Sequence, residues 1–141
     1  MNYVQRLIDD INQSPCSYFV VDTIAKQLTQ AGYVELKEYE QWSLQEGCNY
    51  FVRRNQSSII SFRMGTKLEH GYHFQVVASH GDSPTFKLKD KPEVSAKGNY
   101  TKFSIEGYGG MIAPSWVDRP LSIAGRVLVR NGNKLEHRLL N

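Results

Sequence analysis

The sequence has little of what marks several large classes of protein. Only two cysteines occur in 141 residues, Cys16 and Cys48, and they form no C-x-x-C pair, which argues against a disulfide framework. No apolar run approaches the length of a membrane span, and residues 1–6 do not resemble a signal peptide. We therefore expect a cytoplasmic protein with reduced thiols and no membrane association.

The charge of the chain is small and evenly distributed. A net charge of +3 comes from 17 basic and 14 acidic residues. No basic block is interleaved with aromatic residues, so we expect no nucleic-acid partner. The glycine-rich stretch 107–110 is not G-x-G-x-x-G, and we expect no phosphate binding there. The densest basic group is expected to be a solvated strand face: Lys87, Lys89, Lys91 and Lys97.

Helical periodicity dominates the first 32 residues. Apolar residues recur at i, i+3/i+4 and i+7 over 3–12, which predicts an amphipathic helix. A second helix is expected after it, with Ser14 as the N-cap, Pro15 in the first turn and Gly32 as the C′ residue. Its dense apolar face suggests packing against a sheet.

The rest of the chain alternates as strands do. Residues 49–53 and 58–63 predict a hairpin with its turn at Asn55-Gln56. The apolar run 73–79 predicts a strand buried on both faces. Beyond Pro84 the period becomes two, which predicts strands with one wet face. Asn131-Gly132 predicts a type I′ hairpin turn near the end.

A histidine and a carboxylate follow the apolar run directly. His80 and Asp82 stand two residues apart, so an extended backbone would point both side chains toward one crevice. Open α/β sheets hold their chemistry at such strand ends. Two interpretations remain open on the local sequence. The pair belongs to a metal or catalytic site, or Asp82-Ser83-Pro84 is an ordinary turn with a solvated histidine nearby.

Several segments in register resemble the aspartyl aminopeptidases, the family that includes vacuolar aminopeptidase I. The resemblance runs along nearly all of the chain. The family patterns are "SPSPFHAV…LLQAGF", "ELKE…W", "YFxTRN…SxIIAF", "HTDSP", "ETYGGG" and "WFDRDLxLAGRV". The matching segments are 14–33, 35–42, 50–62, 80–84, 106–110 and 116–127.

The resemblance implies a metallopeptidase fold of the α/β class in two domains. Residues 1–84 would form the N-terminal part of the catalytic α/β sheet domain. Residues 85–141 would begin a β-rich oligomerisation domain, so that the complete protein would be a homo-oligomer. The family carries two zinc ions in each complete active site. Nitrogen and carboxylate ligands would also suit Co²⁺ or Mn²⁺.

The resemblance also assigns roles to two residues of this sequence. His80 carries over as a zinc ligand, and Asp82 as the catalytic aspartate that orients and polarises a ligating imidazole. The remaining ligands and the Glu-Glu pair of the family fall beyond residue 141. A functional reading would make Asp118 a further ligand; the alternative, which we favour, is that it pairs with Arg119 in a loop.

These expectations lead to one main hypothesis and two alternatives. The chain would be the first part of a zinc aminopeptidase that removes N-terminal, preferentially acidic, residues from peptides, and residues 1–141 alone would be inactive. Alternatively, it is a non-catalytic β-rich assembly module, with His80 incidental. A truncated product without independent function is the third possibility.

Overall fold

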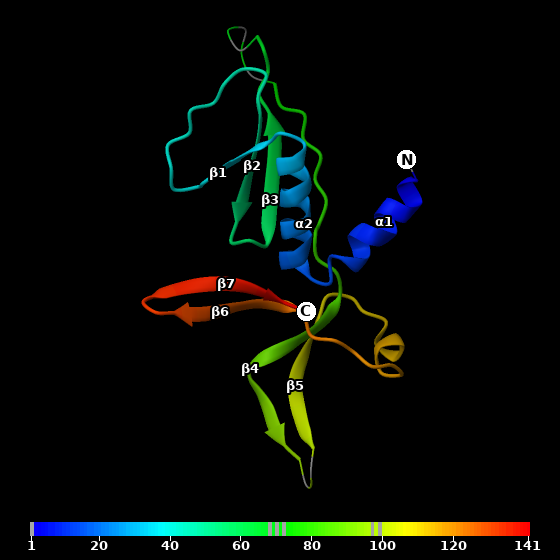
Figure 1. Ribbon diagram of the computed structural model, residues 1–141. Coiled ribbons are helices and arrows are strands. Elements are labelled where there is room, and N and C mark those ends of the chain that lie inside the picture. The colour runs from blue at the N-terminus through cyan, green and yellow to red at the C-terminus, as the bar shows by residue number, and fades with distance from the viewer. Residues whose placement is uncertain (1, 68, 70, 72, 97, 99) are drawn as a thin grey trace. The chain divides into compact units, whose positions relative to one another are not determined.

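The computed structural model describes residues 2–67, 69, 71, 73–96, 98 and 100–141 (Figure 1). The chain divides into two compact units, Met1–Asp82 with Ile123–Asn141, and Ser83–Ser122. Helices, a three-stranded mixed sheet and a β-hairpin make up the first unit, and a second β-hairpin with a short 3₁₀ turn makes up the other. The expected α/β class is thereby confirmed.

Two helices open the first unit. Helix α1 (Tyr3–Asn12) confirms the expected span, and Asn2 caps it by accepting a hydrogen bond from the Gln5 backbone N–H. Helix α2 spans Ser17–Gln30, so it begins two residues later than it would with Ser14 as its N-cap. The prediction of Ser14 as N-cap was wrong, because Cys16 is the last residue with extended φ and ψ before the helix.

The end of α2 follows the sequence prediction. Gly32 has φ +83°, and its N–H donates to the Thr29 carbonyl at 3.0 Å. The Tyr33 N–H donates to the Leu28 carbonyl at 3.0 Å. This pair of bonds is the Schellman motif, which needs a left-handed residue at C′ and therefore favours glycine. The expectation for Gly32 is confirmed.

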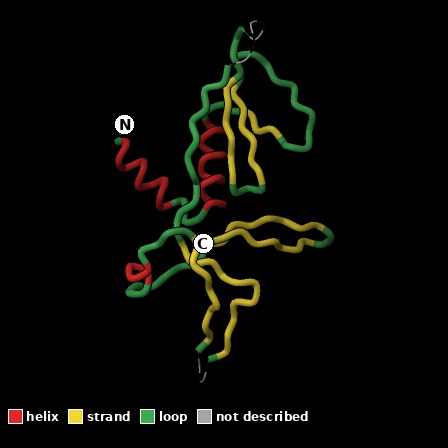
Figure 2. The backbone as a smooth tube through the Cα atoms, turned by 180° about the vertical axis from the view of Figure 1, so that it is seen from behind, coloured by secondary structure: helices red, strands yellow, loops and turns green. Residues whose placement is uncertain are grey.

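A three-stranded sheet packs against α2. Its order is β1 (Val34–Leu36), β2 (Asn49–Arg54), β3 (Ser58–Arg63), with β1 parallel and β3 antiparallel to β2. The expected turn at Asn55-Gln56 is confirmed, and both residues have positive φ, 50° and 57°. Helix α2 lies along the sheet in both ribbon views (Figures 1 and 2).

The core of the first unit is centred on β2. Tyr50, Phe51 and Val52 are all buried, and Phe51 is only 1% exposed. Because consecutive strand residues point to opposite faces, this strand is buried on both sides. On one face the Tyr50 and Phe62 rings meet at 5.7 Å, and Trp42 lies 6.4 Å from Phe62. On the other face Phe51 lies beside Ala25 of α2.

The segment 73–79 differs from its prediction. It forms no strand, and Phe74, Val76 and Val77 are 86%, 81% and 99% exposed. It runs as an extended loop beside α2 (Figures 1 and 2). The prediction of a strand buried on both faces was wrong for these 141 residues, because no described strand pairs with this backbone and nothing covers its side chains.

A second hairpin belongs to the first unit. Strands β6 (Gly125–Asn131) and β7 (Lys134–Leu140) pair from Gly125↔Leu140 to Asn131↔Lys134. The hairpin is confirmed, but its turn is not type I′. Gly132 has φ +59°, whereas Asn133 does not lie in the left-handed region. Glycine at the first central position with only one positive φ matches type II′.

The second unit is a hairpin with one apolar face. Strands β4 (Thr85–Ser95) and β5 (Thr101–Tyr108) pair antiparallel, with a bulge between Leu88 and Glu93. In the turn η2 (Ala113–Trp116), the Trp116 ring meets Phe86 edge-on at 5.6 Å. The described lysines Lys87, Lys89 and Lys91 lie on β4, while Lys97 of the expected basic face lies outside the described residues.

The compact units divide the chain differently from the expected domains. The first break, after Asp82, lies close to the expected one after residue 84, but the last 19 residues group with the first unit. Arg126 of β6 contacts Asn55, which gives a physical reason for that grouping. The boundary between catalytic and oligomerisation domains stays a prediction.

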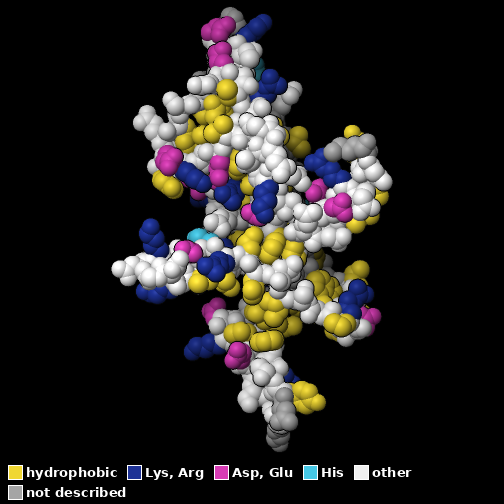
Figure 3. All heavy atoms as spheres, viewed as in Figure 1, with side chains coloured by type: hydrophobic (Ala, Val, Ile, Leu, Met, Phe, Trp, Pro, Cys, Tyr) yellow, Lys and Arg dark blue, Asp and Glu magenta, His cyan; other side chains and the backbone are white. Residues whose placement is uncertain are grey.

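Three smaller expectations also have outcomes. Cys16 and Cys48 are free thiols. The Arg119 Nε lies 3.4 Å from the Asp118 carboxylate, which confirms the expected pair. In the described part of the chain, no helix is long and apolar enough to cross a membrane. Hydrophobic side chains do reach the surface of both units (Figure 3).

Candidate metal-binding site at His80 and Asp82

The candidate site lies where the chain leaves the first unit. Residues 80–82 end the extended segment beside α2, and Asp82 is the last residue of the unit before the chain enters the second. Gly81 lies against helix α2, since a Cβ placed on it would meet Val20 Cγ1 at 3.3 Å. The helix therefore supports the loop that carries both candidate side chains.

The two side chains lie together, as the H-x-D spacing predicts. His80 Nδ1 is 3.3 Å from Asp82 Oδ1 and donates to the Asp82 backbone carbonyl at 2.7 Å. The side chains are 82% and 42% exposed, respectively. Neither group is enclosed in an apolar interior, which would have argued strongly against a metal site.

These contacts select one tautomer of the imidazole. A carbonyl oxygen only accepts hydrogen bonds, so the Nδ1 of His80 that faces it carries the proton. In a neutral ring Nε2 is then unprotonated, and its lone pair is available to a ligand. A metal-binding histidine normally has this arrangement, with the other nitrogen donating to a carbonyl or carboxylate. The donor set therefore fits a zinc ligand.

One imidazole and one carboxylate do not make a complete metal site. Among the described residues, no group of three or more His, Cys, Asp or Glu side chains could hold a metal ion. His70 lies outside the described residues, and the exposed His73 and His137 do not join His80 in such a group. Zinc needs three or four protein ligands, so a zinc site at His80 would require ligands in addition to this pair.

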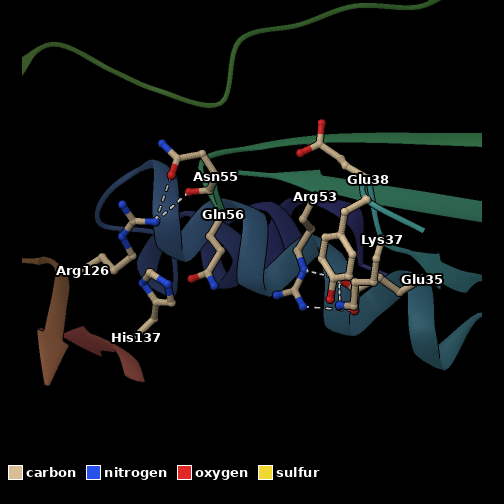
Figure 4. Close-up of a pocket in the computed structure, with 9 residues that line it drawn as sticks. Glu35, Lys37, Glu38, Arg53, Asn55, Gln56, Arg126 and His137 are labelled. Atoms are coloured by element: carbon tan, nitrogen blue, oxygen red, sulfur yellow. Dashed lines mark hydrogen bonds and ion pairs between the residues drawn. The ribbon is translucent and has the colours of Figure 1, made fainter. Parts of the chain in front are cut away.

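A second group of polar side chains lies on the same unit and includes neither His80 nor Asp82 (Figure 4). Arg53 donates to both carboxylate oxygens of Glu35 at 2.8 and 3.0 Å, and Lys37 Nζ lies 2.9 Å from Glu35. Burial alone would raise the pKa of Glu35, but the hydrogen bonds and charges of Arg53 and Lys37 outweigh it and lower that pKa.

The sequence did not single out this cluster as a site. Glu35 pairs with Phe51 in the ladder, so it shares a face with Arg53 two residues further along β2. Only the parallel pairing of β1 and β2 brings the two residues together, and a strand of three residues gives a weak signal in a sequence. Because the Glu35 carboxylate is already paired with Arg53 and Lys37, we assign the cluster a role in holding β1 on the sheet.

The site and fold together define a class before any relative is considered. An α/β unit presents an H-x-D pair on a loop supported by a helix, with an inserted β-hairpin directly after it. The class is that of an α/β protein with a candidate metal-binding pair. Comparison with known proteins identifies the family.

Residues 10–141 match the family described as "Aminopeptidase I zinc metalloprotease (M18)". A probable M18 family aminopeptidase 2 of Clostridium novyi is 40% identical over all of this chain, which covers 33% of that protein. A probable aspartyl aminopeptidase of Ricinus communis is 41% identical over 88% of the chain and 25% of its own length. The solved Saccharomyces cerevisiae mApe1 dodecamer matches with a TM-score of 0.87 and 29% identity, over 98% of this chain and 33% of that one.

The chain belongs to the M18 peptidase family. The resemblance seen in its sequence motifs is confirmed, and the match extends across both structural units. The chain spans about a third of the length of the curated bacterial relative that it matches. The activity of the whole protein is therefore a matter for proposal.

Proposed function

We propose that this chain is the N-terminal part of a zinc aminopeptidase that removes N-terminal residues from peptides. The pairing of His80 with Asp82, in a chain of the M18 family, carries the proposal. His80 would be a metal ligand, and Asp82 the catalytic carboxylate that orients and polarises an imidazole of the site. The remaining ligands and the general base would come from polypeptide beyond these 141 residues.

The two residues of this chain have chemically distinct tasks. With Nδ1 held by the Asp82 carbonyl, His80 would have Nε2 free to bind a metal ion. The Asp82 carboxylate beside the ring favours imidazole basicity and fixes ring orientation. A pair of zinc ions, when bound, supplies a water of lowered pKa and polarises the peptide carbonyl. Cobalt or manganese would bind the same donor types.

Substrate class and assembly come from the relatives. The Ricinus communis relative is named a probable aspartyl aminopeptidase, which supports a preference for acidic N-terminal residues. The yeast mApe1 structure is a dodecamer, which supports a homo-oligomer for the complete protein. The free thiols of Cys16 and Cys48 fit the cytoplasm, where thiols stay reduced.

The test compares this chain with the complete polypeptide that contains it. The 141-residue chain with added zinc should not hydrolyse a chromogenic Asp- or Glu-linked substrate, while the complete polypeptide should. In the complete polypeptide, His80→Ala should lower the bound zinc and abolish turnover. Asp82→Asn should reduce activity or metal affinity about 10- to 100-fold, the range expected when a partner of a metal ligand is lost.

His73→Ala is the matched control, because His73 is an exposed histidine seven positions upstream of the candidate ligand. It should change neither the zinc content nor the rate. Robust turnover by the 141-residue chain alone would show that the site is not shared with other polypeptide. Unchanged zinc and rate in His80→Ala would remove His80 from the site.

One observation favours the second candidate, a β-rich assembly module. On β4 and β5, Leu88, Phe103 and Ile105 share one face and are 44%, 49% and 42% exposed. A two-stranded hairpin is marginal by itself, so this face is suited to association. If His80→Ala assembles normally and changes neither the zinc content nor the rate, the result would support the assembly module in place of the peptidase.

A further inference from the structure

Arg126 joins three segments of the first unit that are distant in the sequence. Its Nη1 donates to the Asn55 carbonyl at 2.9 Å and lies 3.3 Å from Asn55 Oδ1 (Figure 4). Its guanidinium carbon lies 4.6 Å from the centroid of the Tyr18 ring. A planar guanidinium can stack on a ring and donate sideways at the same time, which a lysine ammonium cannot do.

The acceptor of this hydrogen bond is held in an unusual conformation. Asn55 has φ +50°, in the left-handed region that asparagine tolerates better than most residues. Asn55 lies in the turn, one residue beyond Arg54, the last residue of β2 that pairs with β3. Arg126 satisfies the Asn55 carbonyl and fixes the start of β6 to the turn.

Arg126 lies close to the point where the chain returns to the first unit. The chain leaves the first unit after Asp82 and returns to it at Ile123. Arg126 lies three residues after Ile123, and Gly81 lies two residues before Ser83, where the second unit begins. Both contact the first turn of α2, Arg126 at Tyr18 and Gly81 at Val20.

These two contacts lie on opposite sides of the helix. Residues two apart on an α-helix are separated by about 200°, because each residue turns about 100°. Tyr18 and Val20 therefore point in nearly opposite directions. The first turn of α2 is held between the returning strand on one side and the His80–Asp82 loop on the other.

We infer that Arg126 is a positioning residue for the His80–Asp82 pair. Its contacts with Tyr18 and Asn55 fix the helix turn against which Gly81 rests, and thereby the loop that holds the imidazole. Its importance for catalysis rests on the proposed function. Its effect on the geometry of the loop does not.

The hydrogen bond of His80 provides the readout. At about pH 8, where free imidazole is neutral, the 141-residue chain should give two well-separated imidazole ¹⁵N signals for His80, one for protonated Nδ1 and one for unprotonated Nε2. The loss of both signals in His80→Ala assigns them. In Arg126→Met, which keeps an unbranched apolar side chain, the signals should move toward each other as the two tautomers mix.

Arg130→Met is the matched control, since Arg130 is an exposed arginine on the same strand. It should leave both signals in place. Should Arg126→Met fail to fold, Tyr18→Leu removes the ring beneath the guanidinium, and the same mixing is expected. Unchanged His80 signals in the variant that folds would overturn the inference.

The catalytic consequence is measured separately in the complete polypeptide. Arg126→Met should lower kcat about 10- to 100-fold, the cost expected when reacting groups shift by roughly 1 Å. KM should change much less, and Arg126→Lys should recover part of the loss. If the complete polypeptide neither binds zinc nor hydrolyses peptides, the proposed function fails, while the ¹⁵N signals still decide whether Arg126 positions the loop.

Discussion

Two apolar segments of the first unit differ in burial, one being enclosed in the core and the other exposed to solvent. Strand β2 contains Tyr50-Phe51-Val52, and the segment 73–79 contains Phe74 and Val76-Val77. The composition of each segment is typical of a buried strand. Yet Phe51 is 1% exposed and Val77 is 99% exposed.

The difference lies in what surrounds each backbone. Strand β2 has β1 on one edge, β3 on the other, α2 over one face and Trp42 with Phe62 over the other. Segment 73–79 has the helix beside it but no described strand on either edge. An apolar run therefore predicts a tendency toward burial, whereas burial itself requires partners, and partners can belong to other polypeptide.

Truncating a side chain in each segment gives the largest expected contrast. Phe51→Ala should destabilise the chain by about 3–5 kcal/mol, because it removes buried surface and leaves a cavity. Val77→Ala should change stability by less than about 0.5 kcal/mol, as is usual for exposed positions. Urea denaturation followed by circular dichroism measures both.

The same pair of variants sharpens the comparison in the complete polypeptide. If the protein continues as proposed and the further polypeptide covers residues 73–79, Val77→Ala should there cost about 1.5–3 kcal/mol, because it removes two buried methyl groups and leaves a cavity. A cost that stays near zero in the complete protein would mean that this segment remains exposed, and would weaken the account of His80 as a residue at the end of a buried strand.

Prediction from sequence succeeded for most local signals, the exceptions being the Ser14 N-cap and the type I′ turn after β6. The span of α1, the Gly32 cap and the 55–56 turn depend on residues within a few positions of one another, and all three were predicted correctly. The prediction of a strand at 73–79 failed because an apolar run does not by itself supply a paired neighbour, and no described strand pairs with this segment. The H-x-D spacing predicted that His80 and Asp82 would lie together, whereas nothing in the sequence pointed to Arg126 beside Asn55, 71 positions apart.

The ion pair between Glu35 of β1 and Arg53 of β2 should have a smaller effect on stability. Glu35→Gln should cost about 1–2 kcal/mol, less than a fully buried charged hydrogen bond, because the Glu35 side chain is 25% exposed. Glu40→Gln is the control, since Glu40 lies exposed in the turn that follows β1. Equal stabilities of the two variants would mean that Arg53 and Lys37 do not stabilise the edge of β1.

The pH dependence of the same pair has a definite sign. The pKa of Glu35 lies below its ordinary value of 4.5 in the folded chain. Its contribution to stability is therefore complete above that ordinary value and is lost as the pH falls through the lower, folded-state pKa. The stability difference between the parent chain and Glu35→Gln should shrink as the pH falls below the ordinary value of 4.5, and a difference that grows on acidification would contradict this assignment.

The smallest effect concerns the contact between the site loop and α2. Gly81 does not have a positive φ, so alanine fits its backbone and should stabilise the chain by about 0.4–1 kcal/mol through the unfolded state. The new Cβ would, however, meet Val20 Cγ1 at 3.3 Å, and overpacking typically costs about 1–3 kcal/mol. These two effects oppose each other, and we expect Gly81→Ala alone to be slightly destabilising.

Removing the opposing methyl groups separates the two effects. In a Val20→Ala background the close contact is gone, so Gly81→Ala should now stabilise by about 0.4–1 kcal/mol. The family pattern HTDSP has threonine at the position of Gly81, and SPSPFHAV has alanine at that of Val20, which is the same exchange of bulk across the contact. Gly125→Ala is the control, because a Cβ placed on Gly125 has no neighbour within 4 Å. Its effect on stability should not depend on the residue at position 20. A double-mutant cycle with no coupling between positions 20 and 81 would mean that the His80–Asp82 loop does not rest on α2, and the support that we assign to the helix would have to be sought elsewhere.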